Sequence, residues 1–445
     1  MSWKLASLVL AALPLAAQNP LSLKDAVGLA LEKHPSVAAS RSGVQSAELR
    51  VAGARGGYLP KLNYSESWLR SNNPVIVFSS LLTQHQFSAG NFELGPLNRP
   101  GFLNNFQSLV TLDQVVYDAG QTRRAVKSAE LGRNMSAEDE RLTRMTAIAN
   151  VARAYHGAVL AAAAVNVAGE AVHSAEADVK RAESIRAAGM STPADVLSIQ
   201  VHLADVREQQ IRRQADLDVA QAALNEALGL PLSETHQLTT PLTAAPLSEQ
   251  TIEQYEKQAG VSRPELREAR LASSLAETES AGARAALLPQ VTFHAGFEAD
   301  RQTFATRGGA SWLASATLRW NVFNGGSDKA RIGETAYGLA RTRALASQAD
   351  SQVRLQVRRA YADYQSAAQR IQVAQAAVSM AEESLRITKN RYQSGLANVT
   401  DLLRTETALL EARNRHLAAV YDQRLAAVSL ELAAGTLTEK SEVLN

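Results

Sequence analysis

Residues 52–60 read AGARGGYLP, and residues 281–289 repeat this stretch as AGARAALLP, 229 positions later. Beyond it the two copies stay in step for more than a hundred residues, so that Gly120 recurs as Gly326 at a shift of 206. The first copy therefore carries 23 extra residues, all between Pro60 and Gly120. A duplication of this length predicts two equivalent structural units, and not two unrelated domains.

The duplication divides the chain into segments. We predict a first structural repeat at residues 18–230, a linker at residues 231–250, a second repeat at residues 251–435 and a polar tail at residues 436–445. Residues 1–17 are predicted to be a signal peptide, because a positive charge precedes an apolar run that ends in small residues. That run is too short to span a membrane, which disfavours an uncleaved anchor.

Composition excludes several classes of function. The 445 residues carry a net charge of +2 with no basic stripe, so nucleic acid is not an expected partner. Cysteine is absent, which removes thiol catalysis and thiolate metal sites. The eight histidines show no ligand spacing, and we place His156, His173 and His202 on solvated or lumen-facing helix surfaces. No enzyme activity, metal or cofactor is predicted.

Two pairs of strand-like runs follow the Leu-Pro steps. We predict one β-hairpin at residues 61–117, with a long external loop, and another at residues 290–323. The run Ser311–Phe323 alternates in period two, and its apolar face comprises Trp312, Ala314, Ala316, Leu318, Trp320 and Val322. A soluble hairpin with one buried face is the alternative. The signal peptide favours a lipid-facing wall, with Trp312 and Trp320 as membrane-interface aromatics.

Very long helices follow each hairpin. Helical hairpins are predicted at residues 122–228 and 328–434, and each first arm would span on the order of 100 Å. A seven-residue repeat in these arms predicts left-handed supercoiling; in the second copy its positions are Val357, Tyr364, Ile371, Val378 and Leu385, alternating with alanines. Two strands and such long helices cannot bury their own apolar surfaces, so the chain is expected to oligomerise.

Taken together, these features resemble the bacterial outer-membrane efflux proteins of the TolC type over essentially the whole mature length. The resemblance rests on the duplication, the two Leu-Pro steps, the long Ala-rich helices and short motifs that recur in both copies. Those motifs are Tyr117-Asp118-Ala119-Gly120, Phe323-Asn324-Gly325-Gly326, Gly189 with Asp195-Val196-Leu197, and Gly395 with Asp401-Leu402-Leu403.

The resemblance implies an α+β membrane protein. Its fold would be a homotrimeric, 12-stranded outer-membrane β-barrel continuous with a long periplasmic α-helical barrel, built from two internal repeats per chain. Its function would be a passive exit duct for a tripartite efflux pump or a type I secretion system. The implied partners are two further copies of the chain, a periplasmic adaptor (membrane fusion) protein, an RND, ABC or MFS transporter of the inner membrane, and outer-membrane lipid.

The family's functional residues lie at the periplasmic tips. Carried over by position, the adaptor-contact residues are Gly189, Met190, Ser191, Thr192, Gly395, Leu396 and Ala397. The implied constriction and gating residues are Asp401, Asp195, Tyr392 and Arg404. Asp195 and Tyr392 match a closing link of the family, but Ala397 replaces its arginine, and Arg404 stands in place of a second acidic residue. Either aspartate could instead serve only its helix N-terminus.

One other class of protein fits part of the pattern. A soluble periplasmic coiled-coil adaptor or structural rod would account for the signal peptide and the heptads. It would not account for two strand pairs with an apolar face between tryptophans. Fractionation of membranes from soluble protein separates the two interpretations.

Overall fold

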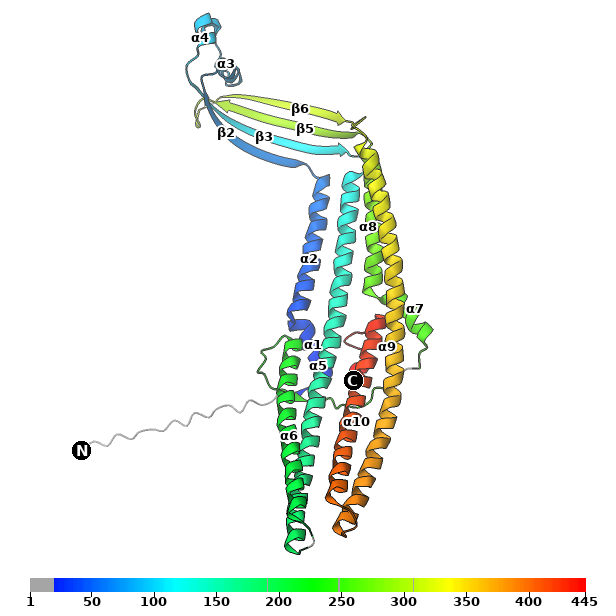
Figure 1. Ribbon diagram of the computed structural model, residues 1–445. Helices are drawn as coiled ribbons and strands as arrows, with labels where there is room; N and C mark the ends of the chain where they lie inside the picture. Colours follow the sequence, from blue (N-terminus) through cyan, green and yellow to red (C-terminus); the bar gives the residue numbers. More distant parts are fainter. Residues whose placement is uncertain (1–19, 190, 247–248, 307) are drawn as a thin grey trace, which may run out of the picture. The chain divides into compact units, whose positions relative to one another are not determined.

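The computed structural model describes residues 20–189, 191–246, 249–306 and 308–445 (Figure 1). The chain forms two compact units, each built from both halves of the sequence. The sheet unit comprises Val44–Ala137 and Glu268–Ala346, and the helical unit comprises the described part of Met1–Gly43, Glu138–Arg267 and Ser347–Asn445. The predicted signal peptide lies outside the described residues.

In the sheet unit, four antiparallel strands form one sheet in the order β2-β3-β5-β6. Their bounds are Lys61–Ser71 for β2, Leu103–Tyr117 for β3, Gln290–Arg301 for β5 and Gly309–Arg319 for β6. Because β3 pairs with β5, the two copies share a single sheet, as Figure 1 shows. Each half thus contributes two strands to a structure that neither half could complete alone.

The register of the sheet separates apolar from polar side chains. Tyr64 lies opposite Val110, Val110 opposite Phe297, and Phe297 opposite Trp312, so one apolar row crosses all four strands. Tyr64, Phe297 and Trp312 are exposed in the single chain. The other face is polar. On it His294 pairs with Asp113, Nδ1 to Oδ1, at 2.8 Å.

Strand β6 is shorter than predicted: it ends at Arg319, four residues before Phe323. The pairing of Gln290 with Arg319 would place Pro289 opposite Trp320, and proline has no backbone N–H for the ladder. The Trp320 indole N–H instead donates to the Leu287 carbonyl oxygen at 3.0 Å. Of the two predicted interface tryptophans, Trp312 therefore lies within a strand and Trp320 just beyond one.

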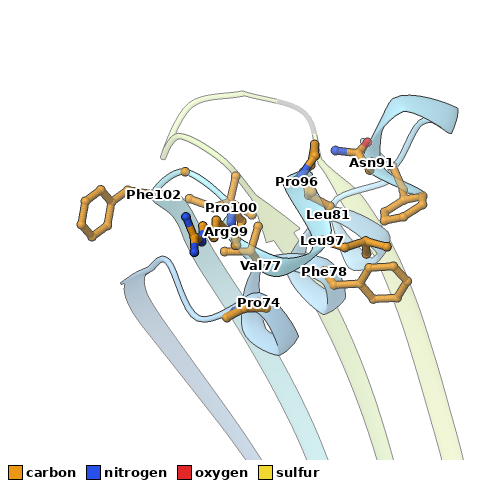
Figure 2. A pocket seen from close by; sticks show the side chains of 13 residues that line it. Pro74, Val77, Phe78, Leu81, Asn91, Pro96, Leu97, Arg99, Pro100 and Phe102 are labelled. Atoms are coloured by element: carbon orange, nitrogen blue, oxygen red, sulfur yellow. The ribbon is translucent and has the colours of Figure 1, made fainter. Parts of the chain in front are cut away.

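The long loop of the first hairpin is folded. It contains α3 (Pro74–Thr83), a 3-10 turn (Ala89–Phe92) and α4 (Leu94–Asn98). Phe78, Phe87 and Phe92 pack edge to face, with centroids 4.7 Å apart for Phe78–Phe87 and 5.1 Å for Phe87–Phe92. Beside them the loop lines a largely apolar cavity of about 520 Å³ (Figure 2).

That loop lies at the end of the sheet where β2 leads into α3 and α4 leads into β3 (Figure 1). Its helix α3 closes tightly onto the start of β6. A Cβ atom at Gly309 would stand 1.9 Å from the Thr83 carbonyl oxygen. Only glycine therefore allows this approach.

The helices begin and end close to the predicted residues. They are α1 (Leu23–Lys33), α2 (Pro35–Arg55), α5 (Gln121–Ala187), α6 (Pro193–Leu228), α7 (Ile252–Ser262), α8 (Pro264–Ala285), α9 (Ser327–Gln393) and α10 (Val399–Ala434). Pro35 and Pro264 each start a new helix, as expected from the missing proline N–H.

The helical unit is packed along the predicted seams. Val357 and Tyr364 of α9 are buried, as are Ala175 and Ala182 of α5. A short parallel ladder of β1 (Pro20–Leu21) and β4 (Gln237–Leu238) joins the start of the first repeat to the linker. The middle of α5 is also apolar enough to span a membrane by length and composition, yet only 17% of that window is buried within the chain.

Hydrogen bonds from Arg424 hold both the linker and the C-terminal tail against α10. The Arg424 guanidinium donates to the carbonyl oxygens of Thr243, Val443 and Asn445. The tail is polar in composition, and its Leu437 and Leu444 are buried in the core of the helical unit. A ten-residue segment with two leucines has no periodicity that indicates what it packs against.

Candidate functional site at the helical tips

The two turns of the helical unit have the same construction. Gly189 ends its helix at φ +75° and Gly395 at φ +71°, a region that favours glycine. In the second turn the Gly395 N–H donates to the Tyr392 carbonyl at 3.1 Å, and the Leu396 N–H donates to the Arg391 carbonyl at 2.8 Å. Leu396 is 70% exposed and so available to a partner. Met190, also predicted to contact the adaptor, lies outside the described residues.

Asp195 forms a capping box at the start of α6. Its Oδ2 accepts hydrogen bonds from the Thr192 backbone N–H at 3.0 Å, the Thr192 hydroxyl at 2.8 Å and the Ser191 hydroxyl at 3.0 Å. The Asp195 N–H in turn donates to Thr192 Oγ1 at 3.2 Å. The Thr192 backbone bond, followed by the two hydroxyl bonds, lowers the pKa of Asp195. Asp195 is thus a negative charge committed to its own helix.

Asp401 is arranged differently. The cap of α10 is Asn398, whose Oδ1 accepts the Asp401 backbone N–H at 2.8 Å, so the Asp401 side chain is not needed for capping. Asp401 is exposed, and its carboxylate has no partner among the described residues. Arg404, one turn further, is exposed too and forms no ion pair with Asp401 within the described chain. The carboxylate is therefore available to a mobile cation.

Tyr392 lies between the two hairpins. It packs against a small apolar cluster of Ala182, Val196, Ile199 and Val399, which joins α5, α6 and α10. Its buried hydroxyl has no hydrogen-bond partner among the described residues, Asp195 included. Burial, and then the Asp195 charge, raise the pKa of Tyr392. The two residues are neighbours, but in this structure they are not joined by a hydrogen bond.

A buried polar network links the same helices farther from the turns. Asp178 of α5, only 2% exposed, pairs with Lys389 of α9 at 3.0 Å and with Arg181 at 3.4 Å. Glu406 of α10 accepts the Ser174 hydroxyl at 3.4 Å and lies 3.5 Å from Nε2 of His202 on α6. The network thus takes side chains from four helices.

The sequence pattern did not predict this network, and the predicted surface positions of two histidines, His156 and His202, are wrong. His202 is largely buried, and His156 is fully buried among core residues, not on a solvated or lumen-facing surface. A signal was present in the comparison of the two copies. At the shift of 206, Asp178 corresponds to Ser384, Glu406 to Gln200 and His202 to Ala408. Each of these three side chains is therefore present in only one of the two copies.

The comparisons with known proteins agree with this architecture. The chain is 25% identical to protein CyaE of Bordetella pertussis over 94% of its own length and 85% of CyaE. It is 24% identical to the alkaline protease secretion protein AprF of Pseudomonas aeruginosa, with the same coverage of both chains. The crystal structure of the Campylobacter jejuni CmeC outer membrane channel superposes with a TM-score of 0.79 at 16% identity, covering 95% of this chain and 87% of CmeC.

The family described as outer membrane efflux protein matches residues 26–230 and 257–436, which together make up most of the chain. Its two matched segments correspond closely to the two copies seen in the sequence. This chain belongs to the outer membrane efflux protein family.

Proposed function

We propose that this chain is the outer-membrane exit duct of a tripartite efflux pump or a type I secretion system. It conducts substrates passively from an inner-membrane transporter and a periplasmic adaptor to the cell exterior. Family membership supports this function, and one relative is named as a secretion protein for alkaline protease. The soluble rod is disfavoured, because it has no use for an exposed apolar sheet face.

The observation that carries the proposal is the apolar row of Tyr64, Val110, Phe297 and Trp312 on a sheet with two free edges. Strands β2 and β6 each have one neighbour in the sheet. Closing those edges against other copies would satisfy the backbone, and lipid would cover the apolar face. Three copies would close a 12-stranded barrel, and their long helices would form the helical barrel. Such packing would also cover the exposed, apolar middle of α5.

Several finer assignments belong to the same proposal. The two copies act as structural repeats at residues 18–230 and 251–435, and residues 1–17 are a cleaved signal peptide. The folded loop with α3 and α4 faces the cell exterior. The exposed residues of both turns, Leu396 among them, meet the adaptor, whose transporter is of the RND, ABC or MFS class. Three copies of Asp401 surround the throat, with Arg404 beside them, while Asp195 and Tyr392 stand between the hairpins.

Single-channel conductance in a planar bilayer tests the duct directly. We expect detergent-extracted protein that elutes as a trimer to insert and give small, long-lived, cation-preferring steps. A folded, helix-rich sample that never inserts would contradict the barrel. A trimer that inserts but prefers anions would contradict the throat assignment of Asp401 alone.

A further inference from the structure

A cavity of about 290 Å³ opens between the two helical hairpins, beside the buried polar network. All four long helices of the helical unit contribute to it. Its apolar walls come from Val167, Ala171, Val206, Leu385, Leu409 and Leu410, and its polar lining from Glu170, Ser174, His202, Glu406 and Arg413. The volume is close to the lower end of the range for pockets that hold small organic ligands.

Glu406 is the polar group that most needs a partner. Its side chain is 8% exposed, and its Oε2 accepts no hydrogen bond from any described residue. A buried carboxylate with an unsatisfied oxygen is costly, so it holds either a proton or a cation. Burial, and then the neighbouring Asp178 carboxylate, raise the pKa of Glu406 to about 8. At neutral pH Glu406 therefore carries a proton when no cation pairs with it.

The nearby cations are already engaged elsewhere. Lys389 and Arg181 pair with Asp178, at 3.0 and 3.4 Å. Arg413 at the rim pairs with Glu170 at 2.8 Å and with Glu382 at 3.0 Å.

His202 faces Glu406 from α6, and burial lowers its pKa although the charges of Asp205 and Asp178 oppose this, so it is neutral at pH 7. The Lys389 charge also acts to lower the pKa of Glu406, but burial and Asp178 outweigh it, and no described side chain forms a direct ion pair with Glu406 while His202 is neutral.

We propose that this cavity binds an organic ammonium ion, namely a primary amine on a small apolar body. The ammonium group pairs with Oε2 of Glu406, the apolar body packs against the leucine and valine walls, and the Glu406 proton passes to solvent. No bond other than O–H is broken. The inference does not depend on the duct function, because it uses contacts within one chain only.

Benzylamine is a suitable probe for the detergent-solubilised full-length chain. Isothermal titration in two buffers of different ionisation enthalpy should show release of about one proton per benzylammonium bound at pH 6 to 7. The affinity should rise about tenfold per pH unit up to roughly pH 8 and then level off. Benzyl alcohol, which has the same body and no charge, should bind at least tenfold more weakly and without pH dependence.

Matched variants locate the site. Glu406→Gln should lose at least tenfold in benzylamine affinity and all of the pH dependence. Glu411→Gln changes an exposed glutamate on the same helix and should behave as wild type. If Glu406→Gln folds poorly, Ala171→Phe fills the cavity from α5 and should abolish binding. Equal affinity and equal proton release in wild type and Glu406→Gln, or no binding by the folded wild type, would overturn the proposal.

Discussion

The Lys389 ammonium lies 3.0 Å from Oδ1 and 3.1 Å from Oδ2 of Asp178, so that one ion pair joins α9 of the second copy to α5 of the first. Asp178 is 2% exposed and Lys389 is 25% exposed. The pair therefore lies in the packing between the hairpins, where removal of one partner leaves the other charge poorly compensated.

Lys389→Met should weaken the contact between the hairpins. The remaining cation beside Asp178 is Arg181, which is 36% exposed and more distant. We expect a loss of about 3 kcal/mol, the usual cost of breaking a buried pair from one side. Thermal unfolding and protease sensitivity of the tips measure this effect. Arg386→Met removes an exposed pair with Glu383 on the same helix and should change stability by less than about 1 kcal/mol.

We expect Asp195 to contribute to stability and Asp401 to contribute to the electrostatics of the channel. Asp195→Ala keeps the Thr192 cap but removes the returning half of the capping box and a first-turn charge, and should cost about 0.3 to 1 kcal/mol of stability. Asp401→Ala leaves the Asn398 cap in place, so its stability should stay near wild type, while block of the channel by divalent cations should weaken. Unfolding curves and bilayer recordings of both variants check this. Unchanged block in Asp401→Ala would remove Asp401 from the throat.

A charge placed on the two faces of the sheet distinguishes lipid from water. Phe297→Arg places a cation in the apolar row and should destabilise the membrane-inserted protein by about 2 to 4 kcal/mol. Ser315→Arg lies on the opposite, polar face, across from His294, and should be tolerated. Yield of heat-resistant oligomer in outer-membrane fractions compares the two. Equal loss in both variants would argue against a lipid-facing apolar side.

His156 should make the protein sensitive to mild acid. Burial, and then the Arg424 charge, lower its pKa to about 4, so the folded state keeps the neutral ring while the unfolded chain protonates near pH 6.5. The contribution to stability is complete above pH 6.5 and is lost as pH falls towards 4, by about 2 to 3 kcal/mol.

His156→Leu removes both ring nitrogens, neither of which has a hydrogen-bond partner among the described residues. We expect this variant to lose less stability than wild type between pH 7 and 4.5, with little difference at pH 8. His173→Leu serves as the control, because it removes an exposed histidine from the same helix. Parallel loss in wild type and His156→Leu would exclude His156 as the cause.

The local sequence pattern was enough to predict the repeat, the bounds of the long helices and the apolar and polar faces of the strands. A seven-residue period, a proline at a helix start and alternation along Ser311–Phe323 each act within one segment, so they can be read without knowing its neighbours. The same reasoning located both turns, because a glycine beyond a long helix marks its end. The predicted strand at Ser311–Phe323 ran four residues too far, because Pro289, just before the neighbouring strand, cannot continue the ladder.

Only the tertiary structure decided which segments meet. The pairing of β3 with β5 and the contact of Asp178 with Lys389, 211 residues away, depend on chain packing that no local period encodes. The caps at the tips, by contrast, are local: Asp195 bonds to Thr192 three residues earlier, whereas Asn398 caps the helix of Asp401 and leaves that carboxylate free. The residue type determines which charge a side chain can carry. Which group it pairs with, and how deeply it is buried, depend on the distances between groups and the exclusion of water in the folded chain.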